Sequence, residues 1–263
     1  MVFYHPLVLG VARPRGPDSS GPDGRRGGEA TTHEAWREGV SRPGEDYERH
    51  PEGQAFARLR SAASQERTRL WVVLGEPGAG KSRLLNEWFR RWAADLGDPR
   101  LGLPVPVLVR LRRLTPPELH LGQEEFADWL WEQGLGERGL LDQPRDAVYR
   151  AGASRLFRPV WLLDGLDEVA PSVPRADLLS GLAALPGLKL LTCRTAVFQA
   201  QREAIAPYQE RGAEYEILPL GPAERRQFLA ARLGDPARAA KLGGLVDGSA
   251  QLAGLAGNPL MLT

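Results

Sequence analysis

The sequence predicts an α/β protein with a five-stranded parallel sheet, helices on both of its faces, and a small helical lid after the sheet. Short apolar runs bounded by turn residues alternate with segments of helical periodicity, which is the pattern of a parallel sheet. After about residue 220 the alternation stops and only helical periodicity continues. The 42% of hydrophobic and 25% of charged residues are ordinary proportions for a globular protein, so a wholly disordered chain is excluded.

The five predicted strands are residues 70–74, 105–111, 160–163, 188–193 and 215–218. The run L-W-V-V-L at 70–74 is short, wholly apolar and followed by Gly75, as expected of a strand that is buried on both faces. Helical periodicity predicts helices at 52–67, 81–96, 177–185, 197–206, 223–233 and 237–246, with further helical material at 126–130 and 146–157. The segment Gly221-Pro222 with Glu224 has the proline and the first-turn acid of a helix start.

These elements divide the chain into a leader at 1–46, a core at 47–220 and a lid at 221–263 that is expected to be incomplete at its C-terminus. Between residues 13 and 46 glycine, proline, serine and charge dominate, a composition that cannot bury enough apolar surface to become ordered. We therefore predict a disordered leader, whose removal would leave ligand affinity and thermal stability nearly unchanged.

Net charge and cysteine content exclude several classes of protein. A formal charge of +1 gives no global field for nucleic acid or anionic membranes, so neither is expected as a specific partner. The single cysteine, Cys193, excludes an intramolecular disulfide and is expected to be an inert core residue. The four histidines are scattered without metal-ligand spacing, and no apolar run could span a bilayer. We expect a cytoplasmic protein.

The strongest motif is G-E-P-G-A-G-K-S at residues 75–82, which fits the phosphate-binding P-loop pattern. Its glycines let backbone N–H groups surround phosphates, and the following helix N-terminus favours the anion. The Lys81 ammonium is expected at the β- and γ-phosphates, and the Ser82 hydroxyl on Mg²⁺. The predicted nucleotide-binding residues here are Gly75, Glu76, Pro77, Gly78, Ala79, Gly80, Lys81, Ser82 and Arg83.

A second motif, V-W-L-L-D-G-L-D-E at 160–168, ends a buried strand in a carboxylate. Asp164 is predicted to hold the magnesium ion together with Ser82, directly or through water. Asp167 and Glu168 are predicted as catalytic carboxylates that orient or deprotonate an attacking water.

Arg194 ends the next predicted strand, in T-C-R at 192–194, and is predicted to contact the γ-phosphate. Such a contact would distinguish a triphosphate from a diphosphate. The alternative is an exposed strand-end arginine, which is common in an arginine-rich chain.

With these motifs in this order, the chain resembles the NACHT-domain NTPases. L-L-D-G-L-D-E is similar to the family's extended Walker B motif, T-C-R to its strand-end sensor, and G-N-P-L at 257–260 to a later family segment. The resemblance implies a P-loop NTPase of ASCE/AAA+-like fold in the STAND class of signalling ATPases, which includes proteins of bacterial defence. It also implies that ADP is exchanged for ATP, that the protein self-associates, and that Pro259 contacts adenine. A helix-capping turn is the other interpretation of Asn258-Pro259.

The function expected from these residues is a nucleotide-controlled switch with slow Mg²⁺-dependent ATP hydrolysis. Two alternatives remain open: a nucleotide-binding interaction module without useful hydrolysis, and a P-loop kinase acting on a small molecule. P-loop contacts are made to phosphates, so the motif alone does not separate ATP from GTP.

Overall fold

The computed structural model describes residues 7–12, 47–64, 70–95, 104–115, 121–136 and 158–262. Its strands form one sheet in the order β2-β1-β7-β3-β6-β5-β4. Their bounds are β1 Val8–Ala12, β2 Tyr47–Pro51, β3 Leu70–Leu74, β4 Pro104–Arg110, β5 Arg158–Asp164, β6 Leu188–Cys193 and β7 Gln209–Ile217.

All five predicted strands are present, and they pair in parallel as β7-β3-β6-β5-β4. Strand β6 lies between β3, which leads into the P-loop, and β5, which ends at Asp164. All of these strands point the same way, so the motifs that follow them meet at one edge of the sheet.

The sheet has seven strands rather than five, because β1 and β2 extend it in antiparallel fashion beyond β7. Part of the predicted disordered leader is therefore wrong: Val8–Ala12 is a strand that pairs with both β2 and β7. Leu9 has no exposed surface, because β1 is held between two strands and covered by neighbouring side chains. Residues 13–46 lie outside the described part of the chain.

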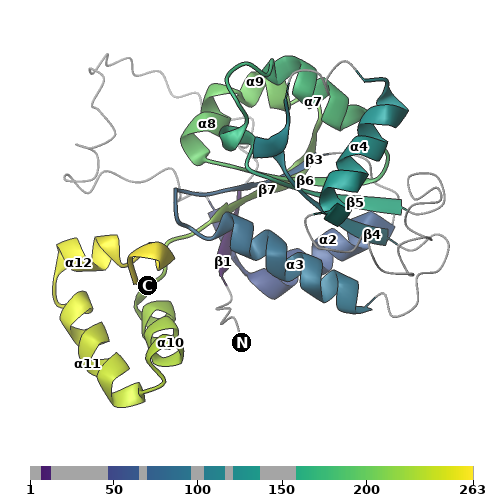
Figure 1. The fold of residues 1–263 in the computed structure, drawn as a ribbon. Helices are drawn as coiled ribbons and strands as arrows, with labels where there is room; N and C mark the ends of the chain where they lie inside the picture. The colour runs from purple at the N-terminus through teal and green to yellow at the C-terminus, as the bar shows by residue number, and fades with distance from the viewer. Residues whose placement is uncertain are drawn as a thin grey trace, which may run out of the picture.

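Helices cover the sheet on both faces (Figure 1). One face carries α4 (Gln123–Gly136), α7 (Arg175–Ala184), α8 (Thr195–Ala200) and α9 (Arg202–Ile205), and the other carries α2 (Glu52–Ser64) and α3 (Lys81–Asp95). The predicted helix at 197–206 is thus divided into α8 and α9. The helical material predicted at 146–157 lies outside the described residues.

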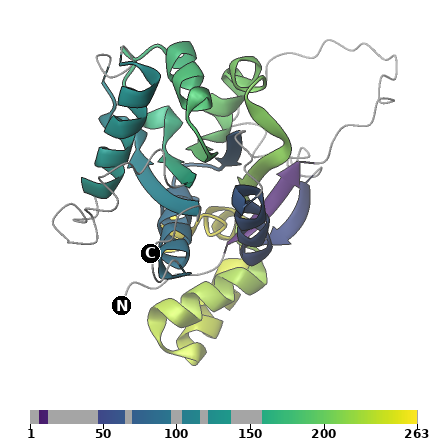
Figure 2. The same ribbon diagram turned by 90° about the vertical axis from the view of Figure 1, so that its right-hand side faces the viewer.

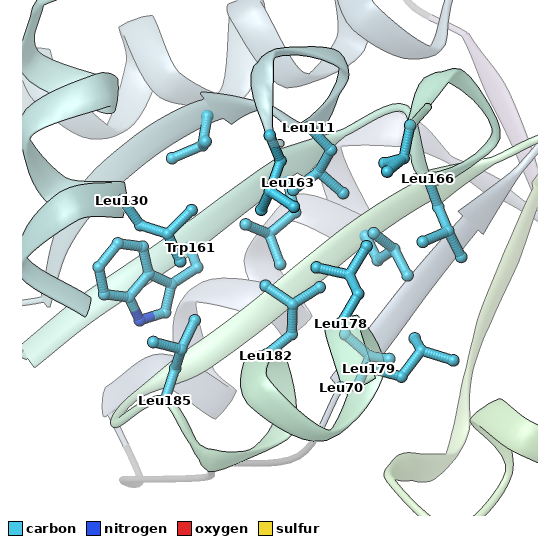
Figure 3. Close-up of a cluster of buried hydrophobic side chains, with 14 of the residues drawn as sticks. Leu70, Leu111, Leu130, Trp161, Leu163, Leu166, Leu178, Leu179, Leu182 and Leu185 are labelled. Atoms are coloured by element: carbon cyan, nitrogen blue, oxygen red, sulfur yellow. The ribbon is translucent and has the colours of Figure 1, made fainter. Parts of the chain in front are cut away.

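Alternate residues of the central strands pack into two separate cores, one on each face of the sheet. In β3, Leu70, Val72 and Leu74 join the cluster under α4 and α7, whereas Trp71 and Val73 join the cluster under α2 and α3. Figure 3 shows part of the first cluster, where leucines of α7 lie against residues of the strands. Burial on both faces explains why these strands lack alternating polarity.

The P-loop helix α3 is tied to the N-terminal part of the chain by a buried carboxylate at the start of α2. Glu52 is 2% exposed and accepts a hydrogen bond from Trp88 Nε1. Arg91 Nη1 of the same helix lies 3.2 Å from Glu52 Oε1. A buried charge is tolerated only when it is paired and hydrogen-bonded, so these contacts fix α2 against α3.

The lid consists of α10 (Pro222–Leu233), α11 (Pro236–Asp247), α12 (Ala250–Leu255) and the 3-10 turn η5 (Pro259–Leu262). Figures 1 and 2 show its helices set to one side of the sheet. Arg225, 7% exposed, holds the lid together through a 2.5 Å ion pair with Asp247 and a hydrogen bond to the Leu220 carbonyl.

Candidate nucleotide-binding site

The P-loop connects β3 to α3 in a conformation that depends on glycine. Gly78 and Gly80 have φ angles of 79° and 102°, in the region that residues with a side chain rarely adopt. Helix α3 begins at Lys81, and its first helical hydrogen bond runs from Leu84 N to Gly80 O. The N-terminus of a fifteen-residue helix therefore opens at the loop, which is where a phosphate is favoured.

Lys81 folds back over the loop. Its Nζ donates to the carbonyl oxygens of Gly75 at 2.7 Å and Glu76 at 3.1 Å. Partial burial lowers the pKa of Lys81, the nearby Asp167 carboxylate opposes this shift, and Arg194 adds to it. An anionic group placed at the loop would favour the charged amine, because an opposite charge stabilises the cation.

Asp164 ends β5 across from the P-loop helix, and it is 9% exposed. Its Oδ1 accepts a hydrogen bond from Ser82 Oγ at 3.1 Å and another from Thr192 Oγ1 at 2.9 Å. The following residue, Gly165, has a φ of 79°, and a Cβ there would meet the Glu168 side chain at 3.1 Å. The two residues proposed as magnesium ligands are thus in direct contact.

These donors fit a magnesium ion held jointly with a nucleotide. Mg²⁺ prefers oxygen ligands and is usually bound by one or two protein groups together with phosphates and water. Ser82 and Asp164 supply a hydroxyl and a carboxylate 3.1 Å apart. Within the described ranges no group of three or more His, Cys, Asp or Glu residues could hold a metal by itself.

Asp167 and Arg194 form an ion pair at the same edge of the sheet. Arg194 Nε lies 2.7 Å from Asp167 Oδ2, and the Arg194 backbone N–H donates to Asp167 Oδ1 at 3.1 Å. The Asp167 side chain is 4% exposed, whereas that of Arg194 is 51% exposed. Both oxygens of this predicted catalytic carboxylate are therefore occupied by the predicted sensor. Glu168, the other predicted catalytic residue, is exposed.

Cys193 lies beside this pair and is fully buried in the core under α4 and α7. Burial, and to a smaller extent the Asp167 carboxylate, raises the pKa of the thiol to about 12. A thiol with such a pKa stays protonated at neutral pH and is a poor nucleophile.

The lid meets the P-loop through the segment after α12. Asn258 Nδ2 donates to Pro77 O at 2.7 Å, and a Cβ on Gly78 would lie 2.8 Å from Leu260 Cβ. Pro259, half-buried, follows Asn258 directly and begins η5. The structure thus brings this predicted adenine contact next to the loop, while Arg83 is exposed in the first turn of α3.

Three neighbours of the loop were not identified from the sequence. Thr192 contacts Asp164, Asn258 contacts Pro77, and Leu7 lies 3.3 Å from where a Cβ on Gly80 would be. Thr192 has a visible signal, since it is a polar residue that follows two leucines near the end of β6, beside the predicted sensor Arg194. The contacts of Asn258 and Leu7 depend on the packing of distant segments, which no local pattern records.

Comparison with known proteins identifies the family. The family model for the NACHT domain matches residues 69–236, which is more than half of the chain. No curated protein gives a significant match. Among the described residues, no helix combines the length and the apolar character needed to cross a membrane.

Two solved structures share the fold at low sequence identity. The Aeropyrum pernix ORC2 protein in its ADP form has a TM-score of 0.52 at 14% identity, covering 80% of this chain and 60% of that one. The Drosophila ORC bound to DNA has a TM-score of 0.50 at 16% identity, covering 80% of this chain and 52% of that one. The chain therefore spans just over half of the length of these structures.

The matched range contains the P-loop with α3, the strand that ends at Asp164, and Arg194. The chain belongs to the NACHT domain family of nucleotide-binding P-loop NTPases.

Proposed function

We propose that the protein is an ATP-dependent switch that binds Mg²⁺-nucleotide at the P-loop, hydrolyses ATP slowly and changes its self-association with the nucleotide bound. ADP would occupy the resting state and ATP the active one. Signalling of this kind, including bacterial defence, is what the NACHT resemblance implies for the chain, and a cytoplasmic location would suit it. GTP remains an alternative ligand.

The observation that carries the proposal is the Asp167–Arg194 pair beside the loop. Arg194 is half-exposed and charged, and its 2.7 Å contact with Asp167 is the type of contact that a terminal phosphate can replace. ADP lacks that phosphate, so the exchange of partners would occur with ATP only. A ligand shifts a conformational equilibrium only through such a difference between states.

Slow hydrolysis follows from the division of roles among the acidic residues. A magnesium ion held by Ser82 and Asp164 would supply charge stabilisation at the transferring phosphate. Glu168 is exposed and able to orient a water, whereas Asp167 is engaged by Arg194. We therefore assign water activation to Glu168 and the holding of Arg194 to Asp167.

The same engagement of Asp167 favours a second candidate, a nucleotide-binding module without useful hydrolysis. With one of two acidic residues occupied, turnover depends on Glu168 alone. This candidate predicts tight nucleotide binding, as for the switch, but negligible turnover. Glu168→Gln would then leave the measured turnover unchanged, whereas in the switch it would lower it.

The test measures the binding of ADP and of a non-hydrolysable ATP analogue, each with Mg²⁺, to the parent and to Lys81→Ala and Asp164→Ala. We expect Lys81→Ala to weaken both nucleotides and Asp164→Ala to remove the Mg²⁺ dependence and the turnover. Lys241→Ala, in the exposed face of α11, is the matched control and should bind as the parent does. If both site variants bind Mg²⁺-nucleotide as well as the parent, the proposal is wrong.

Self-association is tested on the same samples by light scattering. We expect the ATP analogue to raise the molar mass of the parent, and ADP to leave it unchanged. An equal mass in both nucleotide states would remove the oligomerisation from the proposal while leaving the nucleotide site intact.

A further inference from the structure

Thr192 occupies the point where the three strands of the site meet. It lies on β6, where it pairs with Val73 of β3 on one side. On the other side Leu191 pairs with Leu163 of β5, so that Thr192 and Asp164 follow as neighbours. Thr192 has no exposed surface.

The direction of its two hydrogen bonds is determined by chemistry. The Gly165 N–H can only donate, and it does so to Thr192 Oγ1 at 2.8 Å. An ionised Asp164 can only accept, so the single hydroxyl proton of Thr192 goes to Asp164 Oδ1, at 2.9 Å. The hydroxyl therefore bridges the backbone of the turn after β5 to the carboxylate that ends β5.

These bonds define which part of Asp164 is available. Ser82 and Thr192 both donate their hydrogen bond to Oδ1 rather than to Oδ2. Ser82 is itself a proposed ligand of the magnesium ion, whereas Thr192 is fully buried and is not among the proposed ligands. Of the two residues that donate to Asp164, Thr192 is therefore the one that is not itself a proposed metal ligand.

We propose that Thr192 is a positioning residue for the divalent cation: it fixes the orientation of the Asp164 carboxylate, which would hold the ion together with Ser82 and the nucleotide. The inference rests on the proposed Mg²⁺-nucleotide site and adds to it a residue that the ion does not touch. Outer partners of metal ligands typically change metal affinity or activity by about 10- to 100-fold when they are removed.

The experiment uses Mn²⁺ as a spectroscopic probe of the divalent site, measured by electron paramagnetic resonance in the presence of ADP. Thr192→Val preserves the shape of the side chain but removes the hydroxyl. We expect it to weaken Mn²⁺ binding by about 10- to 100-fold, and we expect Thr192→Ser, which keeps the hydroxyl, to restore it. The affinity for ADP in the presence of a chelator should be unchanged in both variants, because the phosphate contacts of the loop are intact.

Leu190→Val is the matched control, because Leu190 is equally buried on the same strand and its side chain has no group that could hydrogen-bond to Asp164. It should lower the melting temperature and leave Mn²⁺ affinity as in the parent. Parent-like Mn²⁺ binding by Thr192→Val, or failure of Thr192→Ser to restore it, would overturn the inference. If Thr192→Val does not fold, Thr192→Ser and Thr192→Ala take its place, with the same difference in Mn²⁺ affinity expected between them. A parent that binds no ADP at all contradicts the proposed function rather than the role of Thr192.

Discussion

At the scale of single residues, Arg194 is the side chain whose contact would differ between ATP and ADP. It is held by Asp167 through its side chain and its backbone N–H. Arg194→Ala should weaken the affinity for the ATP analogue by about ten- to a hundredfold, because a charge-assisted hydrogen bond contributes about 1.5–3 kcal/mol. The affinity for ADP should change little. Calorimetric titration of both nucleotides checks this, and equal losses would leave Arg194 a structural strand-end charge.

The companion variant tests the holding role of Asp167. Asp167→Asn removes the negative charge that competes with phosphate for Arg194, so the preference for the ATP analogue over ADP should rise. In the Arg194→Ala background the same substitution should no longer change that preference, because the guanidinium for which Asp167 and the phosphate compete is absent. Non-additivity of this kind is expected of residues in direct contact.

Lys189 makes a prediction about pH. It is fully buried in β6, and its Nζ donates to the carbonyls of Ala183 and Leu185 at the end of α7. Burial lowers its pKa from 10.5 to about 8, so between these values the unfolded chain binds more protons than the folded one. The contribution of Lys189 to the free energy of unfolding should therefore increase as the pH rises from about 8 to 10.5.

Urea unfolding across this pH range, compared between the parent and Lys189→Met, isolates the contribution. The variant should lack the rise, whereas Lys241→Met, at an exposed position, should follow the parent. Parallel curves for the parent and Lys189→Met would contradict the lowered pKa.

At the scale of elements, β1 has the clearest energetic consequence. Leu9 is fully buried in the core under α2 and α3, and β1 joins β2 to β7. Leu9→Ala should lower the free energy of unfolding by about 2–5 kcal/mol, the usual cost of a cavity left by a buried leucine. Leu245→Ala, at a leucine 64% exposed, is the control and should change stability little. Denaturant unfolding of both variants is the measurement.

This expectation replaces the one drawn from the sequence, that residues 1–46 could be removed without loss of stability. Deletion of residues 1–12 should destabilise the domain, since β2 would lose its partner strand. A melting temperature unchanged by that deletion would show that β7 and β2 are held by other contacts.

The difference between predicted and missed strands has a physical basis. The central strand β3 and the middle of β4 and β5 are apolar on both faces, and this burial makes them visible in the sequence. Strand β2 reads Y-E-R-H-P and has no apolar run, and the apolar run V-L-G-V-A of β1 is separated from its partner β2 by a long segment rich in glycine and proline. The P-loop and Asp164 follow from local motifs, whereas the role of Thr192 depends on the order of strands, which places β6 between β3 and β5.

At the scale of the whole molecule, a narrow contact links the lid to the nucleotide site. Asn258 donates to Pro77 O at 2.7 Å while its Oδ1 accepts from Leu260 N at 3.0 Å. The lid is also hydrogen-bonded to the end of the sheet, from Leu220 N to Gly257 O at 2.8 Å. A nucleotide that changes the P-loop would thus act on the lid through Asn258.

Asn258→Ala should separate the lid from the loop without unfolding it. In hydrogen-exchange mass spectrometry, amides of residues 236–262 should exchange faster in the variant, and ADP should no longer slow them, because a ligand protects a distant segment only when the two are coupled. Ser249 caps α12, because its hydroxyl accepts a hydrogen bond from Leu252 N. Ser249→Ala removes this cap and leaves the hydrogen bond between Asn258 and Pro77 in place. That control should raise exchange within α12 while preserving the response of the lid to ADP. A lid that still responds to ADP in Asn258→Ala would show that coupling passes through the end of β7 instead.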